Sequence, residues 1–396
     1  MLIERAAKLD DEDPLRHLRE EFDLDPGVVY LDGNSLGAPP KRVAGRVEQV
    51  VREQWGRRLI RSWPESWWTA PERVGEKIAP LVGAAPGQVV VADSTSVNVF
   101  KALVGAVRLA QAGSPERREI IVDAATFPTD GYVAESVAEM TGTLLRPVQV
   151  DEFDDVLGDR TAAVLVNHVD YRTGRLHDMP SVTAKVHAAG ARVVWDLCHS
   201  AGVLPIELDA LGVDLAVGCT YKFLNGGPGA PAFIYVPREL QPSFRQPLSG
   251  WGGHRDPFAM ASAYDPDPGI ARARVGTPDI LSLLALDAAL EVWEGVDLAE
   301  VRAKGLALTG FFIECVDELL GDAVEVVTPR DAWRGHQVSL RHQDARTLVA
   351  DLTAREVIGD YRAPDVLRFG FAPLYNRYAD AVQAARSLAE LLTSRN

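Results

Sequence analysis

The fold is decided by a short segment, residues 192–200, which reads RVVWDLCHS. Its first four residues form a mostly apolar run, typical of a strand that is covered on both faces. Similar runs occur on either side, and segments with helical periodicity lie between them at about 96–110, 130–141 and 181–189. These runs are Val89–Ala92, Glu119–Val122, Ala162–Val166, Leu215–Gly218 and Phe233–Val236. The alternation predicts an α/β domain with a mostly parallel sheet.

The character of the sequence changes near Leu281, where two helical stretches, 281–294 and 298–320, come first. Later candidates are strands at Ala323–Val327, Gln337–Leu340 and Leu367–Phe371 and helices near 344–353 and 378–392. Upstream, Pro39 and Pro40 open a helical pattern that places Val43, Val47, Val50 and Val51 on one face. We therefore expect three parts: an N-terminal segment (1–45) packing with the small domain, a large α/β domain (46–278) and a smaller C-terminal α+β domain (279–396).

Composition narrows the classes of partner. The 396 residues include 41 Lys and Arg against 56 Asp and Glu, a formal net charge of −15. Nucleic acids and anionic membranes need basic patches, so neither is expected as a partner. The three cysteines are too few and too scattered for a disulfide framework or a paired-cysteine zinc site. No apolar run approaches the roughly 18 residues of a membrane span. A cytoplasmic protein is predicted.

Ligands of open α/β sheets bind where strands end, so the residues that follow each strand are the candidates for a site. The first such exit carries Thr95 and Ser96 at the start of a helix, where hydroxyls and free N–H groups suit a phosphate. A simple helix cap fits this exit equally well. The second exit carries Phe127, which could stack on a flat ring, and Asp130. A turn capped by Thr129 explains it equally well.

The third and fourth exits carry charged residues in unusual places. Asp196 ends a buried apolar strand, which is costly unless the carboxylate meets a cation such as a pyridinium nitrogen. A metal site formed with His199 is the weaker alternative, because no further ligand cluster lies near in sequence. Lys222 follows the next strand and precedes a glycine-rich loop, where a desolvated amine can form a Schiff base. That loop matches neither a P-loop nor a dinucleotide fingerprint.

Taken together, the four exits supply the parts of one binding site: hydroxyl and N–H groups for a phosphate, an aromatic side chain that stacks on a cofactor ring, a carboxylate for the nitrogen of that ring, and an amine. This set predicts pyridoxal 5'-phosphate as the cofactor, with the protein supplying position and electrostatics. The order of these groups along the chain resembles that of the fold type I pyridoxal phosphate enzymes.

A closer resemblance is carried by seven motifs between residues 30 and 376. The motifs are YLDGNSLG at 30–37, FPTD at 127–130, DLCHSAG at 196–202, YKFLNGGPG at 221–229, GWGGH at 250–254, GTP at 276–278 and RFGFAPLYN at 368–376. In order and spacing they resemble the kynureninases. The resemblance implies hydrolysis of L-kynurenine to anthranilate and L-alanine by a homodimer whose active sites lie at the subunit interface.

The resemblance also implies a role for each matching residue. Lys222 is the Schiff-base lysine, and Tyr221 completes the pocket. Tyr221 is also our candidate for a hydrogen bond to the phosphate and for a proton relay, with simple packing beside the lysine as the alternative. Arg368 binds the substrate α-carboxylate, for which a bidentate guanidinium is suited, and Asn34 and Ser35 shape the substrate end. The residues expected at the cofactor are Thr95, Ser96, Phe127, Asp130, Asp196, His199, Trp251 and Thr277, with Trp251 and Thr277 contributed by the partner subunit.

The substrate ring is less clearly specified by the sequence. In the family, an asparagine at the position of Thr277 is associated with 3-hydroxykynurenine, so threonine here favours unsubstituted kynurenine. The aromatic segment 63–68, which begins with Trp63, is expected near the same ring. A tryptophan cluster that only packs is the alternative for this segment.

Two rival functions remain from the sequence. One is another fold type I enzyme, a cysteine desulfurase or an aminotransferase. A desulfurase needs a mobile nucleophilic cysteine, whereas Cys315 lies in an apolar helical run. The other is a non-catalytic sensor with the same fold, against which the joint presence of Lys222, Asp196 and Arg368 argues.

Overall fold

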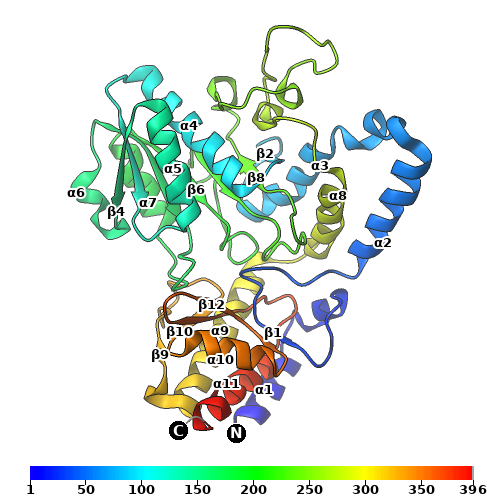
Figure 1. The fold of residues 1–396 in the computed structure, drawn as a ribbon, viewed down its shortest axis with the longest axis vertical. Coiled ribbons are helices and arrows are strands. Elements are labelled where there is room, and N and C mark those ends of the chain that lie inside the picture. The colour runs from blue at the N-terminus through cyan, green and yellow to red at the C-terminus, as the bar shows by residue number, and fades with distance from the viewer. Residues whose placement is uncertain (395–396) are drawn as a thin grey trace.

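A computed structural model describes residues 1–394 and shows two bodies, one above the other in Figure 1. The upper body is built on a seven-stranded sheet in the order β2-β8-β7-β6-β5-β3-β4. All neighbouring pairs are parallel except those of β8, which is antiparallel to both β2 and β7. The strands are β2 (Val89–Val91), β3 (Glu119–Asp123), β4 (Leu144–Val148), β5 (Thr161–Asn167), β6 (Arg192–Asp196), β7 (Leu215–Gly218) and β8 (Phe233–Tyr235). The predicted mostly parallel α/β sheet is confirmed.

Helices cover both faces of this sheet. On one face, Val194 and Val217 join a hydrophobic cluster with residues of α4 (Thr95–Gly113) and α5 (Pro128–Thr141). On the other, Val193 and Trp195 join a cluster with residues of α3 (Ala70–Ile78), α7 (Met179–Ala188) and α8 (Ile280–Ala289). Successive strand residues thus point to opposite apolar layers, which explains why the strands read as continuous apolar runs. A single-turn helix, α6 (Phe153–Val156), precedes β5.

The lower body holds an antiparallel sheet in the order β12-β13-β10-β9 and the helices that cover it. Its strands are β9 (Glu325–Val326), β10 (Gln337–Arg341), β12 (Asp360–Arg362) and β13 (Val366–Gly370). Its helices are α1 (Leu2–Asp11), α9 (Leu298–Leu320), α10 (Ala345–Thr353) and α11 (Tyr378–Thr393). A parallel pair of short strands, β1 (Val29–Tyr30) and β11 (Val357–Ile358), ties the N-terminal segment to this body.

The structure differs from the sequence-based predictions at strand β4 and bears on the predicted domain boundaries. Strand β4 was not expected, because it is an edge strand that is partly exposed and interrupted by Arg146 and Pro147. The division of the chain at 45 and 278 stays a prediction. Because Leu283 in α8 and Val301 in α9 belong to the hydrophobic cluster of the upper body, a boundary within α9 is favoured.

One helix lies at the periphery of the upper body. Helix α2 (Arg42–Gln49) packs against α8, and together with the helical segments Val50–Arg58 and Leu59–Arg61 it forms an arm at the right of Figure 1. The predicted helix is confirmed. On its apolar face Val50 is buried, Val43 and Val47 are half-buried, and Val51 is exposed. None of the helices within residues 1–394 has the length and apolar character needed to cross a bilayer.

Candidate active site

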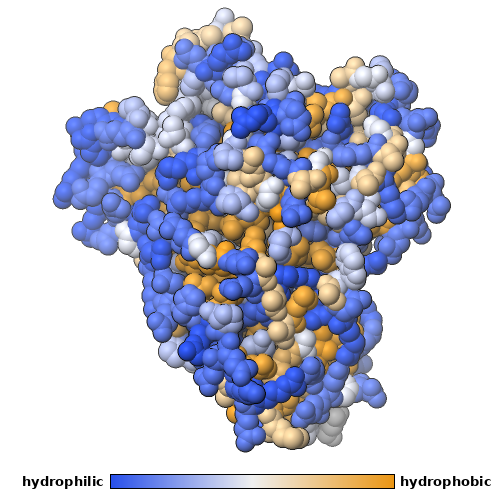
Figure 2. All heavy atoms as spheres, turned by 180° about the vertical axis from the view of Figure 1, so that it is seen from behind, coloured by the Kyte–Doolittle hydropathy of each residue, from blue (hydrophilic) through white to orange (hydrophobic). Residues whose placement is uncertain are grey.

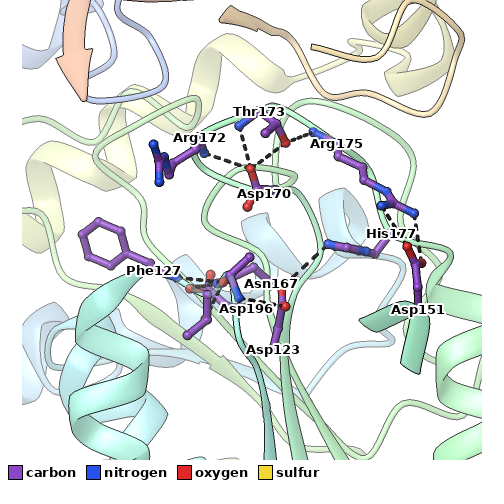
Figure 3. A network of polar contacts seen from close by, with 12 residues as sticks. Asp123, Phe127, Asp151, Asn167, Asp170, Arg172, Thr173, Arg175, His177 and Asp196 are labelled. Carbon is purple, nitrogen blue, oxygen red and sulfur yellow. Dashed lines mark hydrogen bonds and ion pairs between the residues drawn. The ribbon is translucent and has the colours of Figure 1, made fainter. Parts of the chain in front are cut away.

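Asp196 is the last residue of β6, and its carboxylate is buried among hydrogen-bond donors. Its Oδ1 accepts from the backbone N–H of Cys198 at 2.6 Å, and its Oδ2 accepts from Nδ2 of Asn167 at 3.0 Å. Asn167 ends the neighbouring strand β5, so the two side chains meet at the carboxyl edge of the sheet (Figure 3). The edge therefore presents a fixed carboxylate, as predicted from the strand exit.

Asn167 connects Asp196 to the second predicted exit. Its Nδ2 also donates to Oδ2 of Asp130 at 2.9 Å, and its Oδ1 accepts from the N–H of Phe127 at 3.1 Å. Burial, together with the charge of Asp196, raises the pKa of Asp130 well above its ordinary value. Sequence reasoning missed Asn167, although the rule that found Asp196 applies to it, since both end a buried strand.

Lys222 follows β7 and contacts His199, which follows β6. Lys222 Nζ lies 3.0 Å from His199 Nε2 and 5.8 Å from the centre of the Tyr221 ring. Burial and the charge of Lys222 lower the pKa of His199, so the imidazole is neutral and can accept a hydrogen bond from the ammonium. The Nδ1 atom of His199 is buried and has no hydrogen-bond partner among residues 1–394. It is therefore available to a ligand.

The start of α4 provides the place for an anion. Ser94 is the cap residue, its Oγ accepting from the N–H of Val97 at 3.4 Å, and Thr95 is the first helical residue. Cys198 Sγ lies 3.8 Å from Thr95 Oγ1, which ties this helix start to the residues after β6. A cavity of about 330 Å³ opens here, lined by Asp93, Ser94, Thr95, Val97, Tyr221, Gly229, Ala230, Pro231 and Asp279. The predicted Thr95 and Tyr221 thus face one space, whereas Ser96 is not among its lining residues.

Phe127 and Arg368 reach the site from different bodies. The Phe127 ring is 42% exposed and meets the ring of Tyr171 edge-on, with centroids 5.2 Å apart. The backbone oxygen of Tyr171 in turn accepts from Nη1 of Arg368, a residue of β13, at 2.5 Å. Tyr171 therefore connects the ring-covering residue with the predicted carboxylate-binding residue.

Arg368 is not free in this structure, because Asp360 on the neighbouring strand β12 binds it. The Nε of Arg368 donates to Asp360 Oδ1 at 2.7 Å, Nη2 donates to Asp360 Oδ2, and Nη2 also lies 3.2 Å from Ser35 Oγ. Sequence reasoning missed Asp360. The amide of Asn34 lies close to Gly370 and is buried without a hydrogen-bond partner among residues 1–394.

Three predicted residues lie in other surroundings. The ring of Trp63 lies 5.5 Å from that of Trp67 and 6.3 Å from that of Trp68, and Trp68 lies 4.8 Å from Trp251. Thr277 is exposed in the loop before α8. Within residues 1–394, no hydrogen bond or ring contact joins Lys222 to this aromatic cluster or to Thr277.

The assembled groups fit pyridoxal phosphate. The helix start at Thr95 and its cavity suit the phosphate, and the buried Asp196 carboxylate suits a protonated ring nitrogen. The exposed face of Phe127 suits the ring, while the unpartnered Nδ1 of His199 shows that this part of the site awaits a polar ligand. Lys222 is the amine that would hold the aldehyde.

Comparisons with known proteins agree with this fit. The family model of the kynureninase C-terminal domain matches residues 301–388. A kynureninase of Burkholderia pseudomallei is 47% identical over 395 residues, covering 98% of this chain and 95% of the relative. A kynureninase of Deinococcus radiodurans is 50% identical over 393 residues, covering 97% and 95%.

Comparison with solved structures identifies the fold. An apo cysteine desulfurase from Thermococcus onnurineus NA1 superposes with a TM-score of 0.82 at 19% identity, covering 96% of this chain and 98% of that one. A C-DES mutant with glycine covalently linked to its pyridoxal phosphate cofactor superposes with a TM-score of 0.80 at 18% identity, covering 93% and 98%. At these identities the likeness concerns the fold, which is that of the fold type I pyridoxal phosphate enzymes. With its close relatives along nearly the whole length, the chain belongs to the kynureninase family of pyridoxal phosphate-dependent hydrolases.

Proposed function

We propose that the site around Lys222 carries out the reaction of the family, hydrolysis of L-kynurenine to anthranilate and L-alanine. The observation that carries the proposal is the meeting of Lys222, His199 and Asp196 at adjacent strand ends, with Asn167 fixing the carboxylate. The desulfurases that share the fold need a mobile thiol, whereas the three cysteines of this chain are free but buried. A desulfurase activity is therefore disfavoured.

The chain's own residues would divide the work as follows. Pyridoxal phosphate, when bound, supplies an aldehyde for the substrate amine and an electron-withdrawing ring that stabilises negative charge on the substrate carbons. Lys222 removes the proton from the substrate Cα, and neutral His199 holds the lysine ammonium by accepting its hydrogen bond. Tyr221 keeps its proton because burial raises the pKa of its phenol, so it serves as a donor to an oxygen in the site.

The proposal includes a preference for unsubstituted kynurenine over its 3-hydroxy form. Its support is the threonine at position 277, together with the aromatic cluster around Trp63. The change Thr277→Asn is expected to raise kcat/KM for 3-hydroxykynurenine relative to kynurenine, because an amide can bond the extra hydroxyl. Equal ratios for the wild type and the variant would contradict this role of Thr277.

The proposal also includes a homodimer whose partner completes the site. The arm that contains α2 exposes large apolar side chains, with Trp55 55%, Leu59 55% and Ile60 76% exposed. Apolar residues also gather in the middle of the face seen in Figure 2. Patches of this kind mark protein interfaces. A partner there would bring a second Trp251 and Thr277 toward each site.

The proposal also places the protein in the cytoplasm. The free thiols support the cytoplasmic location.

The direct test supplies L-kynurenine to the cofactor-loaded protein and follows anthranilate fluorescence. The wild type is expected to release anthranilate, whereas Lys222→Ala is expected to lose about 10³-fold or more of the rate. Lys8→Ala is the matched control, since Lys8 is an exposed lysine of α1 that should leave the rate unchanged. A yellow protein that forms no anthranilate, or a fully active Lys222→Ala, would overturn the proposal.

A further inference from the structure

The guanidinium of Arg368 is buried, with 1% of the side chain exposed, and most of its N–H groups are already bonded. The carboxylate of Asp360 accepts hydrogen bonds from both nitrogens on one edge of the guanidinium, from Nε at 2.7 Å and also from Nη2. The Tyr171 carbonyl takes one N–H of Nη1 at 2.5 Å. Ser35 Oγ lies 3.2 Å from Nη2 and takes its second N–H. Because a guanidinium has five N–H donors, the one that remains for a ligand is the second N–H of Nη1.

Asp360 is itself firmly held. It lies directly opposite Arg368 in the antiparallel ladder between β12 and β13, so the two side chains share one face of the sheet. Ser35 Oγ donates to Asp360 Oδ2 at 2.5 Å, and Arg362 Nη2 lies 2.8 Å from the same oxygen. Against the effect of burial, the bonds from Arg368 hold the pKa of Asp360 below its ordinary value. A carboxylate with three partners does not readily leave to make room for a ligand.

The charges around this carboxylate do not cancel. Two guanidinium groups, those of Arg362 and Arg368, contact the single carboxylate of Asp360. The nearby Asp32 is half-buried, and its Oδ1 is a buried atom without a hydrogen-bond partner in the described chain. When Asp32 is protonated, one positive charge remains for an incoming carboxylate. The arrangement leaves one N–H of Nη1 and one net positive charge for the ligand.

We propose that Asp360 is a positioning residue, which fixes the Nε–Nη2 edge of Arg368 and so directs the remaining N–H of Nη1 toward the α-carboxylate of the substrate. This inference deepens the proposed function and rests on Arg368 as the carboxylate receptor. The substrate carboxylate therefore does not bind to the Nε–Nη2 edge of Arg368, because that edge already binds Asp360. Asp360 acts through Arg368 and does not touch the substrate.

The test compares two ligands that differ only by the carboxylate. L-alanine and ethylamine are titrated into the cofactor-loaded protein, and binding is read from the absorbance of the bound cofactor. Asp360→Asn is expected to weaken L-alanine binding about tenfold while leaving ethylamine binding unchanged, because a misplaced guanidinium affects only the ligand that it contacts. With kynurenine, KM should rise about tenfold with kcat changed less than about threefold.

A matched control exists in the same sheet. Arg341 and Glu325 are also direct cross-strand partners, with Nη1 of Arg341 2.8 Å and 2.7 Å from the two carboxylate oxygens, but they are exposed. Glu325→Gln removes the same charge from the same kind of pair and should leave both ligands unaffected. Asp360→Glu restores the charge but displaces the carboxylate, so its L-alanine affinity should lie between those of Asp360→Asn and the wild type, about threefold below the wild type.

The outcomes separate this inference from the proposed function. If Asp360→Asn binds L-alanine as well as or better than the wild type, Asp360 competes with the ligand and the inference is overturned. Should Asp360→Asn fail to fold, Asp360→Glu takes its place. Its displaced carboxylate is expected to lower the preference for L-alanine over ethylamine about threefold, and an unchanged preference overturns the inference. A wild type that forms no anthranilate would instead overturn the proposed function, while the two amine titrations would still report on Asp360.

Discussion

At the scale of single residues, Asn167 determines whether two buried carboxylates can share one strand edge. Its amide donates to Asp130 and to Asp196 at 2.9 Å and 3.0 Å. Asn167→Leu removes both donors, and each bond to a charged group contributes about 1.5–3 kcal/mol. We expect the free energy of unfolding to fall by about 3 kcal/mol, measured by urea denaturation, and the cofactor to bind more weakly.

A suitable control for Asn167 is Gln111, whose amide bonds the backbone oxygen of Arg117 near the end of α4. Gln111→Leu removes an amide of the same type from a half-buried place and should cost less than about 1 kcal/mol. If Asn167→Leu were as stable as the wild type, the amide of Asn167 would not be what allows Asp130 and Asp196 to lie together.

A second residue-scale prediction concerns pH. Burial, and then the neighbouring charge of Asp360, raise the pKa of Asp32 to about 7. Below pH 7 the carboxyl is neutral, and above pH 7 it adds a negative charge beside the receptor for the substrate carboxylate. KM for kynurenine is therefore expected to rise several-fold between pH 6 and pH 8. The charged or titratable groups that face Asp32 are Tyr30, Asp360, Arg362, Arg368 and Tyr375.

The matching variant is Asp32→Asn, which keeps the shape and removes the titration. Its KM should stay level across the same pH range, at the value that the wild type has at pH 6. Folded protein binds the Asp32 proton more tightly than unfolded chain. This group's contribution to stability is therefore complete below about pH 4 and is lost as the pH rises through 7. A KM that rises equally in the wild type and in Asp32→Asn would assign the pH effect to another group.

The sequence could predict residues that follow strands but not residues that depend on tertiary pairing. Asp196 and Lys222 stand directly after apolar runs, so local pattern and the geometry of parallel sheets are enough. Asp360 lies on a three-residue strand with no apolar alternation, and its importance comes from lying opposite Arg368. That pairing appears only when β12 and β13 are assembled.

At the scale of elements, periodicity predicted the long helices and the central strands, and it failed where burial is partial. Helix α9 lies at Leu298–Leu320, matching the expected 298–320. Strand β4 gave no signal because its residues are half-buried or exposed at the sheet edge. Helix α2 did give a helical signal, yet its apolar face is only partly covered within the described chain: Val43 and Val47 are half-buried, Val50 just after the helix is buried, and Val51 is exposed.

This arm gives the prediction at the element scale. Trp55→Ser combined with Ile60→Ser is expected to shift the protein from dimer toward monomer in sedimentation velocity. Both side chains are exposed in one chain, so the melting temperature of the monomer should change little. The control is Met140→Ser on α5, at the opposite side in Figure 1, because Met140 is a large apolar side chain that is likewise exposed, at 51%. An unchanged dimer in the double variant would remove the arm from the interface.

At the scale of the whole molecule, the hydrophobic cluster of the lower body is joined by the N-terminal segment and by α9 to the cluster of the upper body that contains Trp195. Leu2 and Ala6 of α1 belong to the cluster of the lower body, whereas Leu15 and Leu18 belong to that of the upper body. The first 22 residues thus pass from one core to the other. Between them lies a buried ion pair, Asp13 with Lys304 of α9, with Nζ and Oδ2 2.6 Å apart.

This pair is expected to lock the N-terminal segment against α9. Both side chains are buried, with 3% of Asp13 and 5% of Lys304 exposed, and burial lowers the pKa of Lys304 although Asp13 opposes that change. Asp13→Ala leaves a buried ammonium whose remaining partner is the backbone oxygen of Pro373, 2.5 Å away. The expected cost is about 3–5 kcal/mol in the free energy of unfolding.

The double variant Asp13→Leu with Lys304→Met separates pairing from packing. Replacing a buried ion pair by apolar side chains is often neutral, so the double variant should cost clearly less than Asp13→Ala alone. The surface pair Lys185 and Asp154 has the same separation of 2.6 Å but is 40% and 62% exposed, so Asp154→Ala should cost less than about 1 kcal/mol. Urea unfolding of all three variants decides the matter. If Asp13→Ala cost no more than Asp154→Ala, water would reach Lys304, and the N-terminal segment would be held by its apolar contacts alone.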